Sequence, residues 1–142
     1  GFEKDMFDII TLRGVIEHVV NPTEVFATVQ KLLKPDGILY ICATPNVDSV
    51  AASIYRENWS LFHPVQHLWH FSPKTITKLA SRFGLSLVFK DLPYLGTPYE
   101  KFAVDLKKFA KDMDGSSPDI PGTTISPPFF ESMMSVIFRN TS

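Results

Sequence analysis

Two groups of side chains in this sequence have residue types that could do chemistry. The first is Glu17 and His18, adjacent in the stretch Thr11–Val19 (TLRGVIEHV), which follows a short apolar run. A carboxylate beside an imidazole can set the imidazole tautomer and support general acid–base catalysis. Neighbours in sequence point in different directions on a helix, so the pair need not be in contact. The alternative is that His18 packs under a ligand pocket while Glu17 makes local contacts.

The second group is His63, His67 and His70, spaced at i, i+4 and i+7. On a continuous helix this spacing would place three imidazoles on one face, where they could bind a metal. Pro64 and the helix start at Ser72-Pro73 argue against such a helix, and the segment contains no carboxylate. We therefore assign no metal site, and keep a metal-binding protein that uses these three histidines as the weakest alternative.

The first elements along the chain predict a βαβ unit. Residues 6–12 form a short apolar run, typical of a strand covered on both faces. Asn21-Pro22-Thr23-Glu24 is a helix start, and Lys34-Pro35-Asp36-Gly37 predicts a turn that ends this helix. Residues 38–45 then form an almost unbroken apolar strand, which would lie parallel to the first.

The remaining elements alternate in the same way. We expect a short helix over 49–58, capped by Asp48 or Asn46, a helix from Ser72-Pro73 to Gly84, and a strand over 85–92. Residues 99–113 predict an amphipathic helix, and 133–140 a fourth strand. Between them, residues 114–128 are rich in Gly, Ser and Pro, and we expect a mobile loop. On the amphipathic helix the expected apolar side is Phe102, Leu106, Phe109, Ala110 and Met113, opposite the solvated Lys107, Lys108 and Lys111.

Composition narrows the class of protein. The chain has 142 residues, 44% hydrophobic and 20% charged, which fits one globular domain. A net charge of -1 gives no reason to expect nucleic acid or an anionic membrane as partner. No apolar stretch approaches the ~18 residues of a membrane span, and the single Cys42 fits a reducing compartment. We expect a soluble, cytoplasmic protein.

Several motifs together resemble one enzyme family. FDII at 7–10, VIEHV at 15–19, LKPDG at 33–37 and TPN at 44–46 occur in the order found in class I S-adenosylmethionine-dependent methyltransferases. The group that includes the ubiquinone-biosynthesis O-methyltransferases is the most similar. Residues 6–92 match continuously. The family's later pattern is matched by Trp59, His67, Phe71-Ser72, Leu79 and Gly84-Leu85, whereas Asp36 replaces a usual glycine.

The resemblance implies an α/β, Rossmann-like fold. The family's sheet has the order 3-2-1-4-5-7-6, with an antiparallel last strand and helices on both faces. Residues 1–142 would supply strands four to seven as one partial domain. The family's Gly-rich loop and acidic ribose contact have no counterpart in this sequence, so we expect an engineered fragment or a truncated gene product. The first strand would then be an open edge that allows homo-oligomers to form.

The resemblance also implies site residues. Leu12, Arg13 and Gly14 would contact the cofactor S-adenosylmethionine, although Arg13 is equally well explained as a surface arginine. Trp59, His63, His67 and His70 would line the acceptor pocket, or else belong to a loop held to the core by its aromatic residues.

The leading hypothesis is methyl transfer from S-adenosylmethionine to a small-molecule acceptor, with His18 as catalytic base and Glu17 beside it. The rival is a non-catalytic module that binds a partner or itself through its open sheet edge. The sequence identifies neither the acceptor nor the oligomeric state.

Overall fold

The computed structural model describes residues 1–115, 125–128 and 130–142 as one mixed α/β unit. The predicted mobile loop over 114–128 lies mostly outside the described residues. The strands are β1 (Phe7–Arg13), β2 (Leu33–Pro45), β3 (Leu85–Asp91) and β4 (Met133–Asn140). The helices are α1 (Pro22–Leu32), α2 (Val50–Tyr55), α3 (Pro73–Ser81) and α4 (Phe102–Met113), with a 3₁₀ turn, Arg56–Asn58, after α2.

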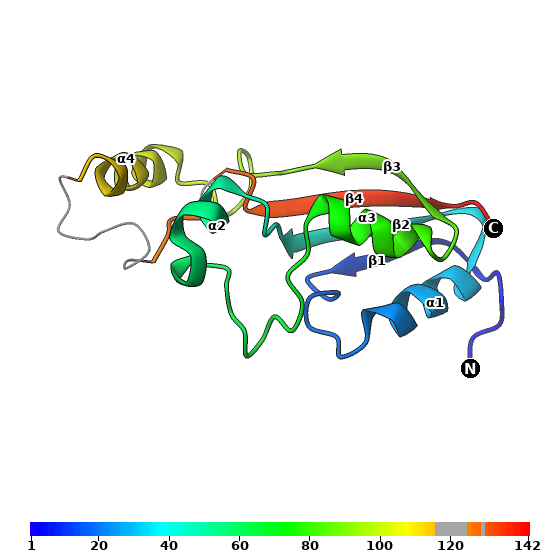
Figure 1. Cartoon of the computed structure of the whole chain (residues 1–142). Helices are drawn as coiled ribbons and strands as arrows, with labels where there is room; N and C mark the ends of the chain where they lie inside the picture. The colour runs from blue at the N-terminus through cyan, green and yellow to red at the C-terminus, as the bar shows by residue number, and fades with distance from the viewer. Residues whose placement is uncertain (116–124, 129) are drawn as a thin grey trace.

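The four strands form a single open sheet in the order β1-β2-β4-β3. β1 pairs with β2 in parallel, and β4 is antiparallel to both β2 and β3. This is the order and direction that the resemblance implied, with β4 inserted between two strands that precede it in sequence. Figure 1 shows the carboxyl ends of β1 and β2 pointing toward α2 and α4, which lie beyond that end of the sheet.

Local sequence signals account for α1 and α3. Asn21 caps α1 by accepting hydrogen bonds from the backbone N–H groups of Thr23 and Glu24, and Pro22 occupies the first turn. Ser72 and Thr75 form a reciprocal capping box at the start of α3. Both helix starts therefore confirm the predictions made from residue type.

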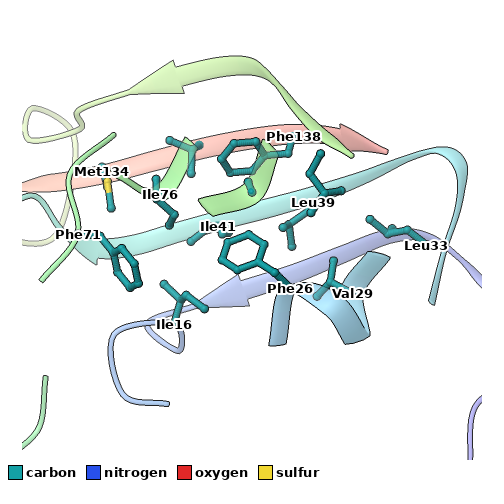
Figure 2. Packing of buried hydrophobic residues seen from close by; sticks show 13 residues of the cluster. Ile16, Phe26, Val29, Leu33, Leu39, Ile41, Phe71, Ile76, Met134 and Phe138 are labelled. Atoms are coloured by element: carbon teal, nitrogen blue, oxygen red, sulfur yellow. The ribbon is translucent and has the colours of Figure 1, made fainter. Parts of the chain in front are cut away.

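The main core lies between these two helices and one face of the sheet. Phe26 and Val29 of α1 and Ile76 and Ala80 of α3 pack in one cluster with buried strand residues. Figure 2 shows the strand side chains pointing toward these helices. The strand residues are Leu39 and Ile41 of β2 and Met134, Val136 and Phe138 of β4.

The opposite face of the sheet is different. Ile9 of β1 is 64% exposed and Phe89 of β3 is 53% exposed. The prediction placed helices on both faces. In the described part of the chain, both helices that pack on the sheet cover the same face (Figure 1). The physical reason is the right-handed crossover, which puts the α1 connection of the parallel pair on one fixed side.

Two element boundaries differ from the predictions. β2 begins at Leu33, so the predicted turn at 34–37 is an irregular part of the strand, where the pairing with β1 shifts register. Asp36 has a φ of 62° there, the left-handed conformation that Asp tolerates better than most residues. α2 is capped by Ser49, not by Asp48 or Asn46, because Asn46 bonds instead to the backbone N–H of Asp48.

α4 differs most from its prediction. It begins at Phe102, and its buried residues are Asp105 and Asp112, whereas Phe102, Leu106 and Met113 are exposed. Of the predicted apolar side, Phe109 is partly buried and packs against a cluster that contains Tyr55 and Trp59. The acidic side is buried because two tyrosines meet it. The Tyr94 hydroxyl donates to Asp105 and the Tyr55 hydroxyl to Asp112, each at 2.6 Å. Lys108, predicted to be solvated, also donates to Asp112.

No described helix combines the length and the apolar character that crossing a membrane requires.

Candidate functional site

A cavity of about 400 Å³ lies at the carboxyl ends of the two parallel strands. Its volume is within the range of small-molecule sites, and this end of an open α/β sheet is where ligands bind. Arg13 and Gly14 at the end of β1 line one side, with Ala43 and Pro45 of β2. The far wall comes from the segment after β3, with Tyr94 and Tyr99, and from residues that lead into β4.

The backbone at the cavity is unusual. Gly14 has a φ of 57° and Ala43 a φ of 56°, and the Gly14 N–H donates to the Cys42 carbonyl at 3.0 Å. Glycine tolerates this conformation, whereas an alanine there is strained. At Ala43 the pairing of β2 with β4 also shifts register, between Ile41 and Thr44. Bulges and strained residues gather near functional sites, and here they border the cavity.

Glu17 and His18 both line this cavity, and the turn after β1 brings them together. The His18 Nε2 lies 3.9 Å from the Glu17 Oε1. Glu17 is 2% exposed, and its other oxygen accepts a hydrogen bond from the Thr44 hydroxyl at 3.2 Å. The predicted pair is therefore a buried carboxylate beside a half-exposed imidazole, close enough to interact.

The histidine-rich segment is fastened to the turn that carries this pair. The His18 Nδ1 lies 2.7 Å from the Gln66 carbonyl oxygen. The Trp69 indole N–H donates to the Val19 carbonyl at 3.0 Å, and the Trp69 backbone N–H donates to the Glu17 backbone carbonyl at 3.2 Å. The segments around residues 17 and 67 thus form one wall, although about fifty residues separate them.

The predicted acceptor-pocket residues divide into two pairs. His63 and His67 line the cavity. Trp59 and His70 are not among its lining residues: Trp59 packs with Ala51, Ala52 and Tyr55 in a second apolar cluster. Burial, and then the neighbouring His67, lower the pKa of His70, and its Nε2 is buried with no hydrogen-bond partner among the residues that the structure describes.

The predicted cofactor contacts divide in the same way. Arg13 and Gly14 line the cavity, whereas Leu12 packs against the main core from β1. The alternation of side chains along a strand explains this, because Leu12 points to the face opposite from Arg13.

Some contributors escaped the sequence interpretation. The backbone carbonyl oxygen of Gln66 lies 2.7 Å from the His18 Nδ1, and that of Leu61 lies 2.9 Å from the His67 Nδ1. Because these are backbone groups, residue type does not predict their contacts. Tyr94 and Tyr99 come from a loop that no motif singled out. Thr44 was visible as part of the Thr44-Pro45-Asn46 strand end, and its place at the carboxyl end of a parallel strand was the usable signal.

A family model matches more than half of the chain. Residues 1–89 match the family model described as a methyltransferase domain. A ubiquinone biosynthesis O-methyltransferase of Glaesserella parasuis serovar 5 (strain SH0165) is 46% identical over 39 residues. That stretch is 28% of this chain and 16% of the relative.

Solved structures share the fold at low identity. A Haloferax volcanii protein, solved in complex with the Trm112 methyltransferase activator, has a TM-score of 0.65 at 12% identity. This chain is covered over 99% of its length but spans only 57% of that protein. The [4+2]-cyclase SpnF has a TM-score of 0.59 at 13% identity, with 98% of this chain and 51% of the cyclase covered. Because a cyclase shares this fold, the fold alone does not determine which reaction a protein catalyses.

Proposed function

The chain belongs to the methyltransferase domain family, and from that membership we propose that it forms the acceptor side of an enzyme that transfers a methyl group from S-adenosylmethionine to a small molecule. The observation that carries the proposal is the cavity at the carboxyl ends of β1 and β2, which the family-matched residues Arg13, Gly14, Glu17 and His18 line together.

The residues present fit one part of the cofactor. Arg13 offers a guanidinium that can pair with the carboxylate of a methionine group. Gly14, with its positive φ, has space where a Cβ would stand, since the nearest atoms are 3.9 Å away. The Gly-rich loop and the acidic ribose contact of the family are not in this sequence. We propose that residues outside it complete the cofactor site, which makes residues 1–142 a partial domain.

The residues that line the cavity then have separate roles in the proposed reaction. When bound, S-adenosylmethionine supplies a methyl group that its sulfonium sulfur has already activated. The chain positions the acceptor between two tyrosines, Tyr94 and Tyr99, and the cavity wall that contains His63 and His67. Such positioning supplies much of the rate enhancement of methyl transfer. The resemblance to an O-methyltransferase favours an oxygen acceptor. His18 is the base that takes the hydroxyl proton at Nε2, and the Glu17 carboxylate stabilises the imidazolium that forms.

Methyl transfer to catechol, measured in the longest protein that contains this chain, tests the role of His18. We expect His18→Ala to lower kcat by about 10²-fold or more, because general-base catalysis contributes that much. Lys74→Ala is the control, since Lys74 is exposed on α3 and does not line the cavity. An unchanged kcat for His18→Ala would remove the base from the proposal.

Calorimetry with S-adenosylmethionine on the 142-residue chain tests the partial site. We expect weak binding that Arg13→Ala reduces further. Tight binding that is indifferent to Arg13 would contradict both the partial domain and the Arg13 contact.

The rival function is a non-catalytic module that associates through β1. One observation favours it: β1 is an edge strand of the sheet, and Ile9 on it is largely exposed. Unpaired edge strands are templates for association. Sedimentation of the same preparation separates the two, because self-association without cofactor binding would favour the module.

A further inference from the structure

Two buried aspartates of α4 make the same contact with two different tyrosines. Asp105 and Asp112 are 4% and 3% exposed. Asp105 accepts a hydrogen bond from the Tyr94 hydroxyl at 2.6 Å, and Asp112 accepts one from the Tyr55 hydroxyl at the same distance. Tyr94 lines the cavity, whereas Tyr55 packs in the second apolar cluster. The helix therefore carries one contact at the cavity and an equivalent contact outside it.

The two aspartates differ in how their charge is compensated. The Lys108 ammonium lies 2.9 Å from Asp112 and provides an opposite charge. Among the residues that the structure describes, no positively charged side chain lies within 4.0 Å of Asp105. A buried carboxylate without a close cation lowers the stability of the fold. Residues that lower stability in this way are often kept because function requires them.

We propose that Asp105 is a positioning residue for the methyl acceptor, because its carboxylate holds the Tyr94 ring in place in the cavity wall through the Tyr94 hydroxyl. This inference rests on the proposed function, since it takes the ligand beside Tyr94 to be the acceptor. Asp112 makes the same kind of contact away from the cavity and only stabilises the packing of α4.

The Tyr94 hydroxyl makes its hydrogen bonds within the protein. It donates to Asp105 and accepts from the Lys101 backbone N–H at 3.3 Å. Burial, and then the hydrogen bond to Asp105, raise the pKa of Tyr94 to about 12, so the hydroxyl keeps its proton at neutral pH. A hydroxyl has one hydrogen to donate, and Asp105 receives it. Tyr94 therefore offers the acceptor its ring and not a hydrogen-bond donor.

The hydrogen bond to Asp105 is the directional contact of this ring. The Tyr94 ring also packs on Phe130, with the centroids 4.9 Å apart, and Phe102 of α4 packs on Phe130 at 5.3 Å. Aromatic rings pack in several geometries of similar energy, whereas a short hydrogen bond to a carboxylate fixes the donor oxygen. Loss of the Asp105 carboxylate should therefore let the Tyr94 ring move while its apolar contacts remain.

Kinetics with catechol, in the longest protein that contains this chain, test the positioning. We expect Asp105→Ala to raise the KM for catechol by about tenfold, the loss of one hydrogen bond to a charged group. The kcat should change by less than about twofold, because the ring contacts the acceptor equally before and during transfer. A merely structural role would do the reverse, since a smaller folded fraction lowers the apparent kcat and leaves KM unchanged. Asp105→Asn keeps an oxygen that can accept from Tyr94, so its KM should stay close to that of the wild-type protein.

Asp112→Ala is the matched control. It removes the equivalent contact on the same helix, so it should lower the free energy of unfolding and leave the KM for catechol unchanged. Tyr94→Phe should raise KM as Asp105→Ala does, and the double variant should raise it no further, because both changes remove one contact. If Asp105→Ala fails to fold by circular dichroism, Tyr94→Phe carries the test. An unchanged KM, or an equal rise in Asp112→Ala, would overturn the proposal.

Catechol binding separates this inference from the proposed activity. In protein labelled with 3-fluorotyrosine, ¹⁹F NMR reports ligand contact, and the Tyr94 signal is the one missing from Tyr94→Phe. We expect catechol to shift this signal, with a dissociation constant about tenfold higher in Asp105→Ala. Binding that depends on Asp105 without any methyl transfer would contradict the proposed function alone. Methyl transfer with catechol binding that is indifferent to Asp105, or a Tyr94 signal that catechol does not shift, would contradict this inference alone.

Discussion

α1 and α4 are both amphipathic helices of similar length, yet they bury opposite kinds of surface. α1 places Phe26 and Val29 in the main core. α4 buries Asp105 and Asp112, and leaves Phe102 39% and Leu106 42% exposed. The difference lies in what each helix meets: α1 faces an apolar sheet, and α4 faces two tyrosine hydroxyls. A periodic stripe therefore predicts that a helix has two sides, but the partner decides which side is buried.

The largest effect is expected in the α1 layer. Phe26 is fully buried, and its ring stacks on Phe83 with the centroids 6.2 Å apart. Phe26→Ala should lower the free energy of unfolding by about 3–5 kcal/mol, through lost burial and the cavity left behind. Urea denaturation followed by circular dichroism measures it. The matched change on α4, Leu106→Ala, should cost less than about 1 kcal/mol because that side chain is partly solvated. Equal losses would mean that α4 buries its apolar stripe after all.

The second prediction concerns the polar contacts of α4. Tyr55 is fully buried, and its hydroxyl is the donor to the buried Asp112. Tyr55→Phe should lower the free energy of unfolding by about 1–3 kcal/mol, because the carboxylate loses a donor that water cannot replace. Lys108 still bonds to the same oxygen and limits the loss. Tyr99→Phe, at an exposed tyrosine, is the control in the same denaturation assay. If Tyr55→Phe and Tyr99→Phe have the same free energy of unfolding, the contact between Tyr55 and Asp112 does not stabilise the packing of α4.

The third prediction is a loss of stability that is absent at neutral pH and develops only under alkaline conditions. Burial, and then the hydrogen bond to Asp105, raise the pKa of Tyr94 to about 12. In the unfolded chain tyrosine deprotonates near pH 10, so between pH 10 and 12 the unfolded chain loses this proton first. The stabilisation from Tyr94 is therefore complete below pH 10 and is lost as the pH rises toward 12.

Urea midpoints at pH 7, 10 and 11.5 measure this loss. Tyr94→Phe should show a shallower alkaline decline than the wild-type chain. Lysines titrate in the same range in both proteins, so the comparison isolates Tyr94. Parallel declines would show that the Tyr94 hydroxyl is not held in its protonated form by the fold.

Much of the sheet layer could be predicted. The helix caps at Asn21 and Ser72 and the four strands were found where residue type and periodicity indicated them, except that β2 begins about five residues earlier. The strand order was not deducible from periodicity, because the insertion of β4 beside β2 pairs residues about 95 positions apart. It came from the resemblance to a family whose order is known.

Less of the site could be predicted. The position of Arg13 and Gly14 at the cavity followed from the rule that ligands bind at the carboxyl ends of parallel strands. The sequence did not predict that His67 lines the cavity whereas His70 does not, because the segment has no regular period that would show which side chains share a face. Trp59, predicted to line the acceptor pocket, packs in a second apolar cluster, a position that its residue type alone did not indicate.

By itself the sequence determined most of the elements, the caps of α1 and α3 and the family, because these depend on residue type and on spacing along a few turns of chain. Only the tertiary structure decided which groups meet. Glu17, His18 and His67 converge because hydrogen bonds join the turn after β1 to the histidine-rich segment, about fifty residues away. The Trp69 backbone N–H donates to the Glu17 carbonyl, and the side chains of His18 and Trp69 bond to the backbone carbonyls of Gln66 and Val19. α4 is oriented by two tyrosine hydroxyls from distant segments. Such contacts depend on direction and distance in space, and local sequence patterns specify neither of them.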